Sequence, residues 1–308
     1  MDTINLKDFD ESPSPPRILY KYLSSDRVSN VLEEGTVRFT PLLNTNDTFE
    51  VRSTFDFLAG PKFLGLLSEQ MENTLSETWI HQRTEEALKE SGLEFLPTEI
   101  AIKIIEQQHG KSFSEMMREN MRQAVDTVLV PQLNDKDNIA KMLEKLGRKL
   151  LCFSMSDRMD SPAMWAHYAE SNAGFVVAFD TESEWFRQRK NGEKTRLQKV
   201  TYLEGKLNEL LDNPQAALIS KTTDWSYERE WRLYIQKEQA DFTVGTSVDP
   251  IHLLKFPPES IDRVILGPKM ITEEAARICA IVESHYPHAK VTRAIPNPQS
   301  HTYEELVV

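Results

Sequence analysis

The stretch that decides the fold is KTTDWSYEREWRLYI, residues 221–235. Aromatic and aliphatic residues alternate with charged ones along it, and alternate side chains of a β-strand lie on the same face. Residues 225–235 are therefore predicted to form one strand. Its core face would carry Trp225, Tyr227, Arg229, Trp231, Leu233 and Ile235. Its other face would carry Ser226, Glu228, Glu230, Arg232 and Tyr234.

Further strands are predicted around this stretch, because short runs of β-branched, aromatic and aliphatic residues end there at turn-forming residues. They cover residues 17–24, 36–40, 149–155, 175–180 and 199–205. Polar caps, helical spacing of apolar residues and terminal glycines predict helices between them. These helices cover residues 24–35, 160–174 and 206–220. The pattern of residues 261–296 predicts a strand, a loop, a capped helix and a strand.

Residues 61–147 differ in character from the chain on either side. Glycine and proline become rare, Glu, Lys, Gln and Met become common, and apolar residues recur at helical spacing. We expect three to five helices here, inserted into one core. Residues 1–16 are polar, contain three prolines and are predicted to be a flexible arm. The predicted fold is α+β: a mixed, mainly antiparallel β core in a single domain of residues 17–308, with the helical insertion at about 61–147.

Composition argues against several classes of function. A net charge of -12 disfavours a broad electrostatic grip on nucleic acid, which needs clustered Lys and Arg. Cys152 and Cys279 are the only cysteines, and no HExxH motif or dense His cluster occurs, so neither a disulfide nor a metal is expected. No run approaches the roughly 20 apolar residues that span a bilayer, and the acidic start does not resemble a signal peptide. A cytoplasmic protein without a membrane partner is the expectation.

Glu228 and Glu230 are the first candidates for chemistry. Two carboxylates at positions i and i+2 of a strand lie roughly 7 Å apart, where they can act as acid and base or stabilise a cationic transition state. Arg232, on the same predicted face, is a candidate to compensate their charge and to contact a ligand. The alternative is a half-exposed strand with surface ion pairs, which is the usual fate of such a face.

A polar loop, NTNDTFE (44–50), follows the predicted strand at 36–40. Asn and Asp cap local backbone in turns, and this is the role expected of Asn44. For Asn46, Asp47 and Glu50 the alternative is a position at the mouth of a pocket, where they would contact a ligand.

The run MWAHYA (164–169) lies in a predicted helix. His167 is a candidate acid, base or hydrogen-bonding group, and Tyr168 is a candidate stacking surface. Ser154, near the end of a predicted strand, and Tyr22, on the first strand, are further candidates for ligand contact. No G-x-S-x-G elbow surrounds Ser154, which argues against a hydrolase nucleophile.

Taken in order, the runs N-D-x-F-E, M-W-x-H-Y-A and W-x-Y-E-x-E-W-R resemble the bacterial family called domain of unknown function 2971. The resemblance covers most of residues 17–270, apart from the helical block. Thr48 stands where the family usually has proline. Membership of this family implies no activity.

The order of parts also resembles, more distantly, the ADP-ribosyltransferases: a basic first strand, a helix, a serine-bearing strand and a final E-x-E. This resemblance implies an ADP-ribosyltransferase-like core in which Arg17 or Lys21 holds NAD. Ser154 would shape the nicotinamide pocket, Glu230 would bond a ribose hydroxyl, and Glu228 would orient the acceptor. A carboxylate beside a developing oxocarbenium ion is electrostatic stabilisation of the transition state.

The leading hypothesis is an NAD-consuming transferase or glycohydrolase, a toxin-like or phage-defence effector that modifies a protein or nucleic acid. One alternative is a non-catalytic module that binds a nucleotide-like ligand or a partner. A second is a phosphodiesterase that uses Asp47, Glu50, Glu228 and Glu230 to hold magnesium or manganese. The helical block is the predicted surface for self-association or for a partner in a defence system.

Overall fold

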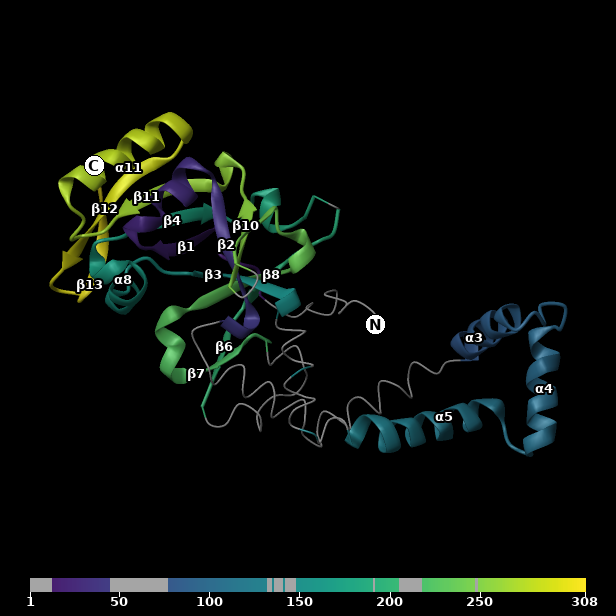
Figure 1. The fold of residues 1–308 in the computed structure, drawn as a ribbon. Helices are drawn as coiled ribbons and strands as arrows, with labels where there is room; N and C mark the ends of the chain where they lie inside the picture. Colours follow the sequence, from purple (N-terminus) through teal and green to yellow (C-terminus); the bar gives the residue numbers. More distant parts are fainter. Residues whose placement is uncertain are drawn as a thin grey trace. The chain divides into compact units, whose positions relative to one another are not determined.

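The α+β prediction is confirmed by a computed structural model (Figure 1). It describes residues 13–44, 77–131, 135, 141, 148–190, 192–204, 218–246 and 249–308. The chain divides into two compact units. One unit comprises Met1–Val51, Glu144–Leu210 and Gln215–Val308, and the other comprises Arg52–Leu143 and Leu211–Pro214. Each unit is described by itself below.

An 11-stranded sheet forms the centre of the first unit within the described ranges (Figure 1). Nine strands follow the order β13-β12-β11-β4-β1-β3-β2-β10-β9, while β8 pairs with β3 and β5. Their bounds are β1 Ile18–Leu23, β2 Thr36–Pro41, β3 Leu150–Ser156, β4 Phe175–Asp180, β5 Leu197–Lys199, β8 Glu230–Gln236, β9 Phe242–Gly245, β10 Pro250–Lys255, β11 Ile261–Leu266, β12 Lys290–Asn297 and β13 Thr302–Val307. Only β11 and β12 are parallel neighbours; the other pairs in this described sheet are antiparallel.

Helix α11, Thr272–His285, connects the two parallel strands as the tail pattern predicts. Its buried residues recur every three to four positions, which is the spacing of one helix face. They are Ala275, Ile278, Ile281 and Val282. This face joins the main core cluster, to which the alternate, inward-facing residues of the strands also contribute. The amphipathic spacing therefore places α11 on the sheet.

The deciding stretch is not one strand. Residues Thr223–Glu228 form a 3-10 helix, and β8 begins only at Glu230. Between them Arg229 has a φ of 46°, in the left-handed region, and its carbonyl accepts the Asp157 amide. The prediction of one strand over residues 225–235 is therefore wrong for residues 225–229, because this turn breaks the period of two before β8.

The predicted core face is correct only from Trp231 onward. Trp231, Leu233 and Ile235 are buried in the main core. Trp225 and Tyr227 are half-buried instead, because they lie in the 3-10 helix and not in the strand.

Helix α8, Pro162–Tyr168, is shorter than the predicted 160–174. Its N-cap is Ser161, whose hydroxyl accepts the Met164 amide. The chain then turns back through residues 170–172, all with positive φ, and reaches Gly174. A Cβ at Gly174 would lie 2.1 Å from the carbonyl oxygen of Leu23 in β1. This close backbone approach explains why glycine is required here.

The second unit contains the helices α3 Glu77–Glu90, α4 Thr98–His109 and α5 Phe113–Ala124, followed by a π-helical turn at Val125–Leu129. Residues 206–217 of the predicted helix at 206–220 lie outside the described residues. Among the described helices, none is both long enough and apolar enough to cross a membrane.

Candidate functional site

Strands β3 and β8 bring the polar faces of two distant segments together. Their antiparallel register pairs Ser154 with Arg232 and Ser156 with Glu230. Intervening residues such as Phe153 and Leu233 face the main core. One face of this strand pair therefore stabilises the fold while the other is available for chemistry, as the alternation from Glu230 onward predicts.

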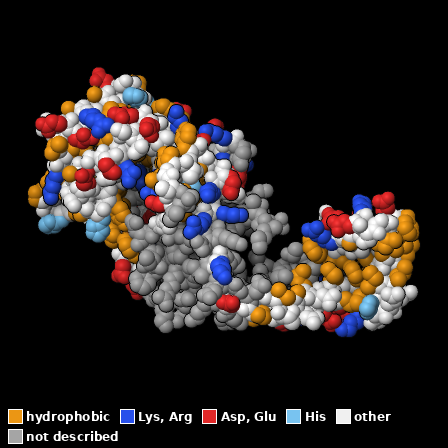
Figure 2. All heavy atoms as spheres, in the orientation of Figure 1, with side chains coloured by type: hydrophobic (Ala, Val, Ile, Leu, Met, Phe, Trp, Pro, Cys, Tyr) orange, Lys and Arg blue, Asp and Glu red, His pale blue; other side chains and the backbone are white. Residues whose placement is uncertain are grey.

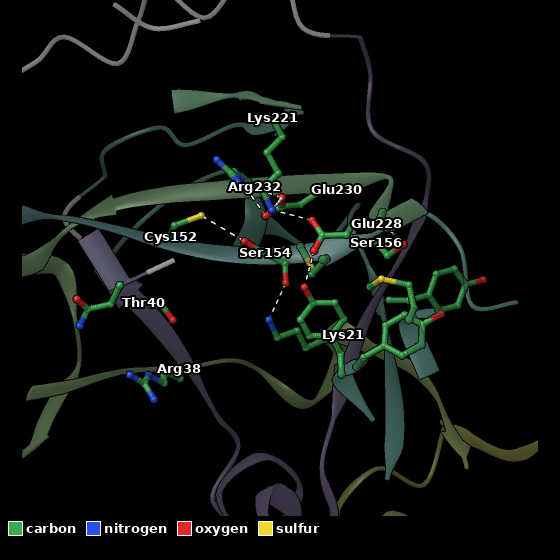
Figure 3. A pocket seen from close by; sticks show the side chains of 16 residues that line it. Lys21, Arg38, Thr40, Cys152, Ser154, Ser156, Lys221, Glu228, Glu230 and Arg232 are labelled. Atoms are coloured by element: carbon green, nitrogen blue, oxygen red, sulfur yellow. Dashed lines mark hydrogen bonds and ion pairs between the residues drawn. The ribbon is translucent and has the colours of Figure 1, made fainter. Parts of the chain in front are cut away.

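A pocket of about 280 Å³ opens over this polar face (Figure 3). Its walls come from β1, β2, β3, β8, α8, the short strand β7 (Ser220–Thr222) and the 3-10 turn before β8. Six charged side chains line it: Lys21, Arg38, Lys221, Glu228, Glu230 and Arg232. The described lining thus carries four cationic groups against two carboxylates, although the whole chain has a net charge of -12.

Lys221 unites the two carboxylates. Its Nζ lies 2.7 Å from Oε2 of Glu228 and 2.8 Å from Oε2 of Glu230. All three side chains are at most 7% exposed. Glu228 reaches this position from the end of the 3-10 turn, not from the strand face assumed in the sequence prediction. The E-x-E pair therefore converges on one ammonium group instead of lying in line along a strand.

Arg232 holds the other side of Glu230. Its Nε and Nη2 donate to Oε1 and Oε2 of Glu230 at 2.9 and 3.0 Å, a two-pronged contact that fixes the carboxylate plane. Burial raises the pKa of Glu230, but Arg232 and Lys221 outweigh it and hold the pKa well below its usual range. Glu230 is therefore a permanently ionised carboxylate at neutral pH.

Tyr168 completes the carboxylate side of the pocket. It comes from the end of α8, and its hydroxyl donates to Oε1 of Glu228 at 2.5 Å. Tyr168 also lines the pocket. Tyr22 and Ser154 also line the pocket. The Tyr22 hydroxyl is already engaged, since it donates to the Arg158 carbonyl at 2.9 Å.

Lys21 and Arg38 form a cationic side, across β3 from the carboxylates (Figure 3). Lys21 projects from β1, and its Nζ donates to the Ser154 carbonyl at 2.7 Å. Burial lowers the pKa of Lys21; Cys152, Glu230 and Glu228 oppose this effect, and Arg38 adds a smaller lowering. On the surface drawn in Figure 2, by contrast, Lys and Arg are interspersed with Asp and Glu across the first unit.

Two candidates lie outside the pocket. Arg17 precedes β1, its side chain is 67% exposed, and it pairs with Asp180 at 3.1 Å. His167 is exposed on α8, with its Nδ1 3.3 Å from the hydroxyl of Tyr227. Neither contributes to the described lining.

The polar loop candidates Asn46, Asp47 and Glu50 lie outside the described residues. The described range 13–44 stops just before them, at Asn44. Asn44 lines the pocket, although only a turn is predicted for it. Within the described ranges, no group of three or more His, Cys, Asp or Glu side chains is placed to hold a metal ion.

The comparisons with known proteins support one prediction. Residues 164–233 match the family model described as "Protein of unknown function (DUF2971)", so the predicted family is confirmed there. This match runs from α8 into β8 and contains the E-x-E pair with Tyr168, Lys221 and Arg232. Neither the curated proteins nor the solved structures include a match to the chain.

Proposed function

We propose that this member of the DUF2971 family is an NAD-consuming enzyme, either an ADP-ribosyltransferase or an NAD glycohydrolase, as its pocket chemistry suggests. One observation carries the proposal: a single pocket has a buried pair of carboxylates on one side and cationic side chains on the other. NAD has a matching polarity, because its nicotinamide ring is cationic and its pyrophosphate is anionic.

In the proposed reaction, the bond between ribose C1′ and the nicotinamide nitrogen breaks, and the electron pair leaves with nicotinamide. The positive charge that develops on the ribose ring is stabilised by ionised Glu230, which also accepts a hydrogen bond from a ribose hydroxyl. Water, or a hydroxyl or amine of an acceptor, forms the new bond to C1′ and releases a proton. Glu228 is placed to orient that nucleophile.

The side chains around Glu228 and Glu230 support these two roles. Arg232 and Lys221 fix the position of Glu230, so little reorganisation is needed when charge develops. Lys21 is assigned to the pyrophosphate in preference to Arg17, because Lys21 lines the pocket and Arg17 does not.

A non-catalytic nucleotide-binding module is the second candidate. Both carboxylates are already held by Lys221, and Glu230 is also held by Arg232. Such a network can serve as a rigid, charged wall that recognises a ligand without turning it over.

The test is release of nicotinamide from NAD, measured by chromatography with and without cell lysate as a source of acceptor. We expect release by the wild type, and its loss in Glu230→Gln and Glu228→Gln with an unchanged circular dichroism spectrum. Glu182→Gln is the matched control, because Glu182 is 65% exposed and outside the pocket lining.

The same preparation separates the two candidates. A rise in Tm with NAD but no nicotinamide release supports the binding module and rules out the enzyme. The absence of both a Tm shift and nicotinamide release contradicts both candidates.

A further inference from the structure

On the edge of β3 opposite β8, two different strands, β1 and β2, pair with different parts of β3. Its Ser156 pairs with Tyr20 of β1, while its Cys152 and Leu151 pair with Thr40 and Pro41 of β2. Between these pairings, neither of the two described strands is in register with Ser154. The two strands therefore form a fork, and Ser154 lies in its opening.

The backbone of Ser154 faces that opening. The Asp157 amide donates to the Arg229 carbonyl, so the backbone N–H and C=O of Asp157 point towards β8. In a strand these groups point to opposite sides at successive residues. Those of Ser154, three residues earlier, therefore point away from β8. The Lys21 ammonium group, which comes from β1, bonds the Ser154 carbonyl and confirms this direction. In an extended strand the N–H and C=O of one residue point to the same side, so the Ser154 N–H also faces the opening.

Arg38 supplies a cation from the other arm of the fork. Val37 and Phe39 face the core, so Arg38 and Thr40 face the pocket. The Nε of Arg38 is buried and has no hydrogen-bond partner among the described residues. A buried donor without a partner is costly, and one explanation is a ligand that supplies the acceptor.

We propose that the fork, defined by Lys21, Arg38, Thr40 and Ser154, is a phosphate-binding subsite. A phosphate offers several acceptor oxygens, which suit a guanidinium N–H, an ammonium group, a hydroxyl and a backbone N–H. Its negative charge also offsets the proximity of Lys21 and Arg38. In this arrangement the phosphate lies on one side of Ser154 and the E-x-E pair on the other (Figure 3).

The subsite restricts the substrate class, and this step rests on the proposed function. A ligand that spans from the fork to Glu230 must carry phosphate at one end and the ribosyl bond to be broken at the other. Phosphorylated nicotinamide nucleotides meet this requirement. Nicotinamide riboside, which lacks phosphate, does not.

The subsite is tested by titrating inorganic pyrophosphate into the full-length protein by calorimetry. We expect saturable binding by the wild type and a loss of affinity of about 10-fold or more in Arg38→Gln, because a charge-assisted contact is removed. Arg17→Gln, a change to an exposed arginine outside the pocket, should bind like the wild type. Equal affinity of Arg38→Gln and wild type, or no binding by the wild type, overturns the proposal.

Hydrogen exchange of the wild type gives a measurement that does not depend on the folding of a variant. Pyrophosphate should slow hydrogen exchange of the Ser154 amide. An unchanged exchange rate at saturating pyrophosphate would contradict the phosphate-binding subsite. Binding of pyrophosphate without nicotinamide release leaves the subsite standing and refutes the enzyme. Nicotinamide release from NAD and from nicotinamide riboside with equal kcat/KM keeps the enzyme and refutes the subsite.

Discussion

Replacing Lys221 by methionine removes the cation that the two buried carboxylates share. Both carboxylate oxygens lie within 2.8 Å of its Nζ, and the lysine side chain is 5% exposed. Breaking a buried ion pair by deleting one partner costs about 3–5 kcal/mol. Glu230 keeps Arg232 and Glu228 keeps Tyr168 as partners, so we expect a loss near the lower end, about 3 kcal/mol.

The loss should depend on pH in a defined direction. In the wild type the pKa of Glu230 is held below its ordinary value, so its contribution to stability is fully present above about pH 4.3. Without Lys221, one of the cations that lower the pKa of Glu230 is gone, so this pKa rises. The stabilisation that ionised Glu230 contributes above about pH 4.3 is then smaller in the variant, whereas neither protein has it once the carboxylate is protonated at low pH. The loss should therefore be larger at pH 8 than at pH 3, by up to about 1.4 kcal/mol for each unit by which the pKa of Glu230 increases.

The assay is urea unfolding followed by tryptophan fluorescence at the two pH values. Four of the five tryptophans belong to the unit that contains the pocket, so the signal reports mainly on that unit. Lys190→Met is the control, because Lys190 also pairs with a carboxylate, that of Asp241, but its side chain is 82% exposed. It should have little effect. A Lys221→Met loss below about 1 kcal/mol, or one independent of pH, would refute the reasoning about buried charge.

Three further changes test other parts of the first unit. Tyr168→Phe removes the hydroxyl that donates to Glu228 and should lower the free energy of unfolding by about 1.5 kcal/mol in urea; an unchanged value contradicts a structural role for this bond. Gly174→Ala places a Cβ against the Leu23 carbonyl and should cost about 3 kcal/mol, measured in the same way, whereas wild-type stability would show that the backbone yields freely there. Arg17→Gln should leave Tm unchanged, because this arginine is exposed, and a clear fall would argue for a stabilising role.

Much of the fold follows from local patterns. The alternation of apolar and polar residues from Glu230 to Ile235 predicts both faces of β8, and the tail pattern predicts β11, α11 and β12. The break at Arg229 is different, because a left-handed residue is not marked by glycine or asparagine there. Its conformation is accompanied by an ion pair with Asp157, which lies far away in sequence.

The pocket is predictable only in part. Tyr168, Ser154 and the E-x-E pair stand out by residue type and neighbourhood, and the structure brings them together. Lys221 does not, because its role depends on the 3-10 turn that folds Glu228 back onto it. The run TVRFT places Arg38 on one face of a strand but cannot say whether that face meets solvent or a pocket. Long-range pairing decides that question.

The divided pairing of β3 has a mechanical consequence. In the described sheet, β3 links two groups of strands. One group has five strands, β13, β12, β11, β4 and β1, and the other has three, β2, β10 and β9. Each group of strands has its own twist. A small rotation of either group about β3 therefore changes the distance between Lys21, which is in β1, and Arg38, which is in β2. A ligand bound to both residues would fix the two groups of strands relative to each other, so the curvature of the sheet would differ between the free and the ligand-bound protein.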